Sequence, residues 1–139
     1  MNIDSINNGI VIDHITAGRG MYIYDLLGLG ELECPVALIK NAGSPKMGKK
    51  DIIKIDGSAD INLDAIGYAD PGVTINYIEN GVRVKKTTVD LPLRLVNVIR
   101  CKNPRCISSC EQELDQIFKL TDRGTKEYRC IYCETKGKA

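Results

Sequence analysis

CKNPRC at residues 101–106 and CIYC at residues 130–133 decide the fold of the C-terminal part of this chain. The cysteines follow the pattern C-x4-C, then 23 residues, then C-x2-C. Two short chelating turns separated by a strand-bearing loop place four thiolates in the tetrahedral arrangement of structural zinc sites. Because all four ligands would come from the protein, no open position remains for catalysis. We predict one structural Zn²⁺, bound by Cys101, Cys106, Cys130 and Cys133.

Other thiol chemistries remain possible for these stretches. An iron site of the rubredoxin type is the chemical competitor of zinc. A C-x-x-C redox motif at residues 130–133 would make the chain a small thiol oxidoreductase, but it leaves CKNPRC without a role. Disulfides are rare in the cytoplasm, which is the expected compartment because the N-terminus lacks the basic and apolar regions of a signal peptide.

Two cysteines fall outside this set. Cys34 is expected to act as a small hydrophobic residue before a strand. Cys110 lies close to the first cysteine pair, but a pairing with Cys106 would leave Cys101 without a role. We therefore expect neither Cys34 nor Cys110 to bind the metal.

Composition narrows the class of protein. The 139 residues suit one ordinary domain or two small ones. The formal net charge is only +1, Trp is absent and Phe occurs once, which argues against nucleic acid as a partner. No apolar stretch approaches the roughly 20 residues that span a membrane, so no membrane partner is expected.

The cysteine distribution suggests two domains. Five of the six cysteines follow residue 100, and LPLRLVNVIR at residues 91–100 connects the two parts. We place the boundary near residue 97, giving domains at 1–97 and 98–139. A domain close to about 40 residues usually needs a staple, which zinc would supply.

The N-terminal part alternates between strand and helix patterns. Asn80-Gly81 is a strong signal for a type I′ hairpin turn, since both central positions of that turn need positive φ. The order β-α-β-β-α-β followed by a hairpin extension predicts a ferredoxin-like antiparallel sheet with two helices on one face. The predicted class is α+β, with a small all-β, zinc-ribbon-like domain after it. The expected elements are strands at 9–15, 35–43 and 49–57, helices at 18–30 and 61–70, and a hairpin at 73–89.

The strand KKDIIKI places lysines on one face. Side chains alternate along a strand, so Lys50, Ile52 and Lys54 share a face opposite to that of Asp51 and its neighbours Ile53 and Ile55. One interpretation is an edge strand that its lysines protect against aggregation. The other is an anion site, such as one for nucleotide phosphates beside a base.

His14 and Asp13 end the first strand beside this lysine face. A lone histidine is more often structural, yet His14 could donate to a phosphate and Asp13 could accept from a ribose hydroxyl. The sequence has no G-x-G-x-x-G or Walker pattern and no recognisable Ser-His-Asp arrangement. We therefore predict that the chain is not an enzyme. The mixed charges of residues 111–129 favour a protein partner over a phosphate backbone.

Several segments together resemble a known family. GIVIDHI, KMGKKDIIKI, VTINYIENGVRVKK and DLPLRLVNVIRCKNPRCIS, followed by C-x-Y-C, are similar to the regulatory chain of aspartate carbamoyltransferase. The resemblance implies a non-catalytic regulatory subunit with an allosteric nucleotide domain and a zinc domain. In the family, regulatory dimers join catalytic trimers, CTP often with UTP inhibits, and ATP activates pyrimidine synthesis. A zinc-ribbon module for nucleic acid or transcription is the alternative function.

The resemblance also implies site residues. Asp13 and His14 match a ribose- and phosphate-contacting pair, and Asn103 matches a polar position at the catalytic-chain interface. The other implied nucleotide-site positions are Lys50 and Lys86 for phosphates, Lys54 for the sugar and base, Asn76 and Ile78 for the pocket lining, and Ile3, Ile6 and Val11 near the segment that closes over the base.

The hairpin departs from the family pattern. Gly81 stands where the family can carry Tyr, and Arg83 replaces a small apolar residue, which affects base discrimination. A regular two-residue turn would pair Asn76 with Lys85 and turn Lys86 to the opposite face. Either a bulge restores Lys86 to the nucleotide face, or Lys85 takes its role.

Overall fold

The computed structural model describes residues 6–137, which form two compact units. The division falls between Asp90 and Leu91, earlier than the predicted boundary near residue 97. The reason is that Arg94–Val96 (β6) pairs with Ile117–Asp122 (β7) and belongs to the second sheet. The connecting stretch is therefore part of the C-terminal unit rather than of the N-terminal one.

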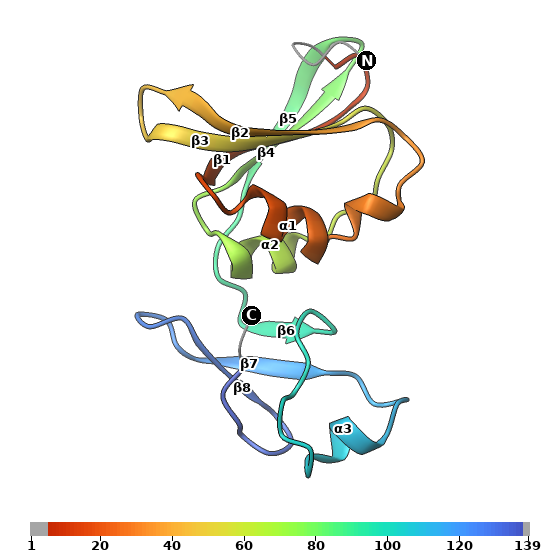
Figure 1. Cartoon of the computed structure of the whole chain (residues 1–139), viewed down its shortest axis with the longest axis vertical. Helices are drawn as coiled ribbons and strands as arrows, with labels where there is room; N and C mark the ends of the chain where they lie inside the picture. The colour runs from red at the N-terminus through yellow and green to blue at the C-terminus, as the bar shows by residue number, and fades with distance from the viewer. Residues whose placement is uncertain (1–5, 138–139) are drawn as a thin grey trace. The chain divides into compact units, whose positions relative to one another are not determined.

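The first unit contains one five-stranded antiparallel sheet in the order β2-β3-β1-β4-β5 (Figure 1). The first four strands have the ferredoxin-like order, and the hairpin partner β5 extends the sheet at one edge, as the sequence predicted. The elements are β1 Gly9–Thr16, α1 Gly20–Leu26, η1 Leu29–Glu31, β2 Val36–Ser44, β3 Gly48–Ile55, α2 Leu63–Ala69, β4 Thr74–Glu79 and β5 Val82–Thr88.

Local sequence signals set the helix ends. The Asn62 side chain accepts hydrogen bonds from the backbone N–H groups of Asp64 and Ala65, which caps α2 at its predicted start. Gly28, at φ 67°, lies in the left-handed region after α1. The chain then continues as the short 3-10 helix η1, so the predicted helix at 18–30 is divided in two.

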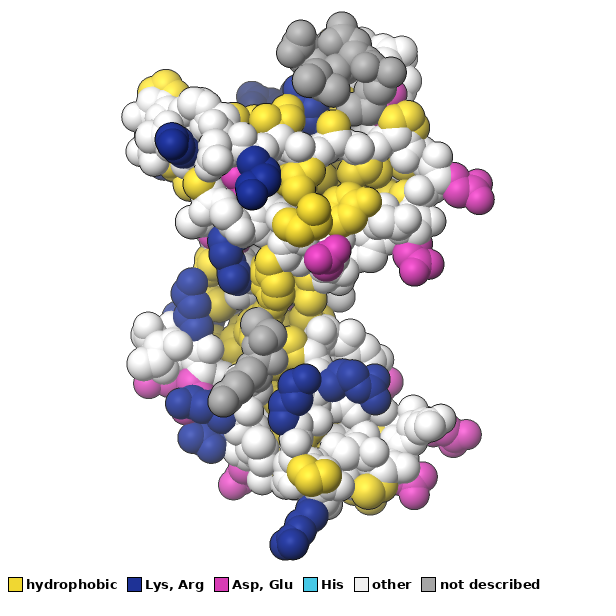
Figure 2. Space-filling view, viewed as in Figure 1, with side chains coloured by type: hydrophobic (Ala, Val, Ile, Leu, Met, Phe, Trp, Pro, Cys, Tyr) yellow, Lys and Arg dark blue, Asp and Glu magenta, His cyan; other side chains and the backbone are white. Residues whose placement is uncertain are grey.

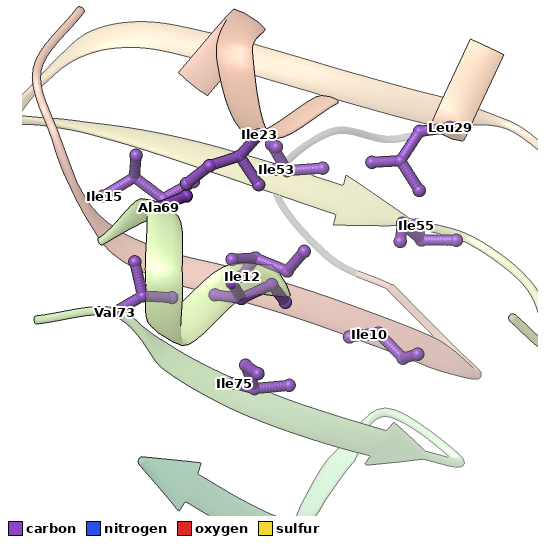
Figure 3. Close-up of a cluster of buried hydrophobic side chains, with 11 residues drawn as sticks. Ile10, Ile12, Ile15, Ile23, Leu29, Ile53, Ile55, Ala69, Val73 and Ile75 are labelled. Atoms are coloured by element: carbon purple, nitrogen blue, oxygen red, sulfur yellow. The ribbon is translucent and has the colours of Figure 1, made fainter. Parts of the chain in front are cut away.

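Branched aliphatic side chains build the core between the sheet and its helices. Ile12, Ile53 and Ile75 from three neighbouring strands are fully buried and face Ile23 of α1 and Ile66 of α2. Figure 3 shows side chains from strands and helices converging on one cluster. Burial of such a side chain stabilises the fold by about 1.5–3 kcal/mol relative to exposure. Cys34 packs against this cluster, as the sequence predicted.

A buried carboxylate organises the approach to α1. Asp51 is fully buried on the core face of β3 and accepts hydrogen bonds from the backbone N–H groups of Gly18, Gly20 and Asn41 at 3.1, 2.9 and 3.0 Å. A Cβ atom at Gly20 would lie 2.8 Å from Asp51 Oδ2 and 2.7 Å from Leu38 Cδ1. The GRG stretch at residues 18–20 therefore binds an internal anion and serves the fold.

β3 is a central strand. It pairs with β1 on one side and with β2 on the other, so the edge-strand interpretation of its lysines is wrong. Lys50, Ile52 and Lys54 alternate with the buried residues Asp51, Ile53 and Ile55, as predicted. We call the sheet face that carries Lys50 and Lys54, opposite α1 and α2, the outer face.

The β4–β5 hairpin contains a bulge. Asn80 (φ 53°) and Gly81 (φ 76°) both have positive φ, as a type I′ turn requires. Ile78 pairs with Arg83, but Tyr77 pairs with Lys85, so Val84 is an extra residue in β5. Lys86 therefore lies directly opposite Asn76. Of the two alternatives that the sequence left open, the structure shows the bulge.

The second unit holds a three-stranded antiparallel sheet in the order β6-β7-β8, where β8 is Glu127–Cys130. Its fully buried side chains are Leu95, Phe118 and Tyr128, with Cys106 and Cys130 close to full burial. A four-residue helix, α3 (Ile107–Cys110), follows the first cysteine pair and was not predicted. The unit is β-rich, and its apolar interior is much smaller than that of the first unit.

Candidate metal centre and nucleotide site

The four predicted zinc ligands lie together. The Sγ atoms of Cys101, Cys106, Cys130 and Cys133 all lie within 4.8 Å of one another. Cys101 and Cys133 Sγ are 3.5 Å apart, and Cys106 and Cys130 Sγ are 3.7 Å apart. Four sulfurs around Zn²⁺ at about 2.3 Å are separated by about 3.8 Å, so the cluster fits one tetrahedral zinc ion. A closed set of four thiolates is a structural site.

The first cysteine pair is shaped by Asn103. Its backbone carbonyl accepts from the Cys106 N–H at 3.1 Å, and its side-chain oxygen accepts from the Arg105 N–H at 3.0 Å. The Ser109 hydroxyl also donates to the Asn103 carbonyl, at 2.8 Å. These bonds tighten the CKNPRC turn, so Asn103 has a structural role within the turn in addition to the interface role implied by the resemblance.

The second cysteine pair is closed by Thr135. The Cys130 N–H donates to the Thr135 carbonyl at 2.9 Å, and Cys133 Sγ shares a hydrogen bond of 3.2 Å with Thr135 Oγ1. That hydrogen bond lowers the pKa of the Cys133 thiol to about 6. Burial raises the pKa of Cys101 to about 12. Four adjacent thiolates repel one another, and a bound cation offsets that repulsion.

Gln116 connects the metal site to the rest of the unit and was missed in the sequence. Its buried side chain accepts from the Cys101 N–H at 2.9 Å and donates to the Ser108 carbonyl at 2.7 Å. Its backbone N–H donates to Asn97 Oδ1 at 2.9 Å. Nothing in the local pattern marks a glutamine 15 residues after a cysteine, since only the folded chain places it against CKNPRC.

The remaining cysteines lie outside the cluster, as predicted. Cys110 is exposed at the end of α3, and Cys34 belongs to the first unit. The thiol oxidoreductase alternative loses support, because Cys130 and Cys133 lie with Cys101 and Cys106 in one four-thiol cluster. A redox pair would need only the C-x-x-C turn and would leave the other two thiols without a function.

The outer face of the first sheet brings most of the predicted nucleotide residues together. The strand registers align Lys54 with Val11, Val11 with Asn76, and Asn76 with Lys86. This row crosses four strands and carries a lysine at each end, with an amide and a valine between them. Ile78, opposite Gly9, lies in the neighbouring row.

Asp13, His14 and Lys50 form one corner of the outer face. Lys50 Nζ lies 3.0 Å from Asp13 Oδ1, and His14 Nδ1 lies 2.9 Å from Thr74 Oγ1. His14 has φ 59° and lies in a β-bulge, because the pairing of β1 with β3 shifts between Ile12 and Ile15. The bulge therefore sets the direction of the His14 side chain.

Asn76 carries an unsatisfied acceptor. Its Oδ1 atom is buried and has no hydrogen-bond partner among the described residues. Most buried polar side-chain atoms are hydrogen-bonded, and this exception lies in the same row as Lys54 and Lys86. An amino or hydroxyl group of a bound ligand would satisfy it.

Three further positions were named from the resemblance, namely Gly81, Ile6 and Ile3. Gly81 has the left-handed φ of the turn and donates its N–H to the Asn7 carbonyl at 2.8 Å, a conformation that an aromatic residue rarely adopts. Ile6 is buried. Ile3 lies outside the described residues.

No helix in the described part of the chain is long and apolar enough to cross a membrane.

Comparison with known proteins assigns both units to one family. Residues 1–90 match the family of the aspartate carbamoyltransferase regulatory chain, allosteric domain, and residues 94–139 match the metal binding domain of the same regulatory chain. Aspartate carbamoyltransferase regulatory chains of Clostridium botulinum and Clostridium tetani are 51% and 47% identical, each over 96% of this chain and 92% and 94% of their own. That of Bifidobacterium longum is 40% identical over 99% of both chains. The chain therefore belongs to the family of aspartate carbamoyltransferase regulatory chains.

Proposed function

We propose that this chain is a non-catalytic, cytoplasmic regulatory subunit whose outer face binds nucleoside triphosphates and whose zinc unit docks on the catalytic chain of aspartate carbamoyltransferase. CTP and UTP would act as inhibitors and ATP as an activator of pyrimidine synthesis. A regulatory dimer is the expected unit of assembly. The observation that carries the nucleotide site is the row of Lys54, Val11, Asn76 and Lys86 on one sheet face.

The outer face suits a nucleotide for four reasons. Its lysines supply cations for phosphates, and Val11 and Ile78 supply apolar surface against which a base can pack. The unpartnered Asn76 Oδ1 accepts from a ribose hydroxyl or a base amino group. Asp13 Oδ1 lies 3.0 Å from Lys50 Nζ, and its Oδ2 lies 4.0 Å from His14 Nδ1, so this carboxylate holds two of the expected phosphate-contacting side chains together.

The zinc unit suits a docking role because its metal fixes a short irregular surface. CKNPRC and α3 have little apolar packing of their own, and the metal supplies the rigidity that a protein interface needs. Removal of zinc by a mercurial reagent should therefore dissociate the chain from catalytic trimers. Assembly that stays tight after complete zinc loss would contradict the docking role.

Lys86 and Lys85 provide a matched test of the nucleotide site. Lys86 shares the row with Asn76, whereas Lys85 lies opposite Tyr77, with its Nζ 5.5 Å from the centre of the Tyr77 ring. We expect Lys86→Gln to weaken binding of CTP, UTP and ATP on the order of tenfold by loss of one charge-assisted contact. Lys85→Gln should leave binding within about twofold. Calorimetric titration of the zinc-loaded full chain measures both.

Two outcomes would count against the proposal. Absence of heat for every nucleotide with the wild-type chain would overturn the nucleotide site while leaving the docking role intact. Equal weakening by Lys85→Gln and Lys86→Gln would show that the outer face is not the binding surface. Carbamoyltransferase activity should be absent from the chain alone and should respond to nucleotides only in the assembly with catalytic trimers.

A further inference from the structure

Three cations form a row across the second sheet. The register pairs Arg94 of β6 with Lys119 of β7, and Lys119 with Arg129 of β8. Directly opposite residues of antiparallel strands point to the same face, with their Cβ atoms about 4.5–5.5 Å apart. Like charges in such positions destabilise a sheet. Three cations in a row therefore repel one another unless anions lie nearby.

A groove lies over this row. It has a volume of about 460 Å³ and is lined by Arg94, Lys119, Thr121, Arg129, Cys130, Ile131 and Glu134, so it borders one of the metal ligands. All of these residues lie within the second unit. Figure 2 shows Lys and Arg side chains scattered among Asp and Glu side chains on the face of the molecule in view.

The charges of the groove are only partly balanced. Arg129 donates to Glu127 Oε1 at 3.2 Å and to the Glu134 carbonyl at 2.9 Å. Glu127 also pairs with Lys136 at 3.3 Å, and the hydrogen bond from Thr121 is the largest influence that lowers its pKa and keeps it ionised.

Arg94 and Lys119, by contrast, have no anionic partner in the part of the chain that the structure describes. Glu134 contributes one carboxylate to the lining and forms no ion pair with either cation there. Two cations of the row are thus left for an external anion.

We propose that the Arg94–Lys119–Arg129 row is a docking site for an acidic segment of a protein partner, which places carboxylates over Arg94 and Lys119. A guanidinium and a carboxylate pair in planar, bidentate geometry, which suits Arg94. A nucleic acid is disfavoured because the groove lining holds no aromatic side chain for base stacking and the chain has a net charge of only +1. This proposal rests on the proposed function, because the acidic segment is expected to belong to the catalytic chain.

The row can be tested without the catalytic chain. The zinc-loaded full chain, labelled with ¹⁵N, is titrated with a hexaglutamate peptide, and amide shifts are followed residue by residue. We expect saturable shifts in β6, β7 and β8, and an affinity on the order of tenfold lower for the Arg94→Gln/Lys119→Gln variant. Lys126→Asn, on the exposed turn before β8, is the control and should change the affinity less than about twofold. Retained amide dispersion confirms folding of each variant.

Other results would overturn the docking site. Peptide-induced shifts confined to the outer face of the first sheet would show that the peptide does not bind at the row. Equal peptide affinity of the double variant and the control would show the same. Tighter saturable binding of inorganic phosphate at the row would make it a small-anion site instead. Tighter binding of a ten-residue thymidine oligonucleotide there would make it a nucleic-acid surface.

Assembly with catalytic trimers separates this proposal from the proposed function. If the wild-type chain assembles, the double variant should assemble on the order of tenfold more weakly and with a smaller salt dependence. Unchanged assembly of the double variant would overturn the acidic-segment contact and leave the regulatory function standing. Peptide binding at the row by a wild-type chain that fails to assemble would support the row and contradict the regulatory function.

Discussion

The two units of this chain are held together by different physical means. The first unit buries Ile12, Ile53 and Ile75 between a five-stranded sheet and two helices, so apolar burial is its main source of stability. The second has three short strands and few large buried side chains, and its four cysteines meet at one point. A unit of this size and composition depends on its metal, whereas the first unit does not.

Metal removal should therefore unfold the second unit and leave the first unit folded, which is the largest effect that we expect. Structural zinc sites in small domains contribute roughly 10–16 kcal/mol of apparent binding free energy, which is also folding free energy. Stripping zinc, or the substitution Cys106→Ser, should collapse the amide NMR dispersion of residues 91–137 and leave that of the first unit unchanged. Retained dispersion in the second unit after verified zinc loss would contradict this comparison.

The matching test of the first unit is Asp51→Ala. The substitution leaves three backbone N–H groups without their acceptor in a fully buried place, and we expect it to cost at least about 3 kcal/mol of unfolding free energy. Denaturant unfolding followed on the first unit measures it. Asp60→Ala, at an exposed position, is the control and should stay within about 0.5 kcal/mol. Zinc affinity should not change in either variant; a parallel loss would show that the units are not independent.

A smaller effect is expected at Gln116, which supports the metal site of the second unit. Gln116→Ala removes the acceptor of the Cys101 N–H and the donor to the Ser108 carbonyl, and so loosens the first cysteine turn. We expect zinc affinity to fall about tenfold, as for other residues that orient metal ligands, measured by competition with a chelator of known affinity. Gln112→Ala, on the exposed segment after α3, should leave the affinity unchanged. Equal zinc affinities of the Gln116→Ala and Gln112→Ala variants would show that Gln116 does not contribute to zinc binding.

In both units, the features that the sequence predicted are those that depend on residues close together in the chain. The spacing of Cys101, Cys106, Cys130 and Cys133 is set by the reach of two turns around one ion, and the Asn80-Gly81 turn by the positive φ of both residues. The alternation in KKDIIKI is likewise local, and all three predictions are confirmed. These features depend on residues close together in the chain, so their signals are present in the sequence itself.

The features that were missed depend on pairings between distant strands. The edge-strand interpretation of the KKDIIKI lysines is wrong because β3 lies between β1 and β2 in the sheet. The boundary lies earlier than residue 97 because β6 pairs with β7, which begins 21 residues after β6 ends. Gln116 gains its role only when the second sheet forms against CKNPRC. No local periodicity carries this information.

The sequence by itself determined that four thiols would hold one metal, that the first unit is a split β-α-β sheet with a hairpin, and which family the chain resembles. The tertiary structure alone decided which side chains of different strands lie opposite one another. A single extra residue, Val84, turns Lys86 rather than Lys85 toward Asn76, and the register of β6, β7 and β8 aligns Arg94, Lys119 and Arg129. The physical reason is that a shift of one residue in strand pairing moves every later side chain to the opposite face of the sheet.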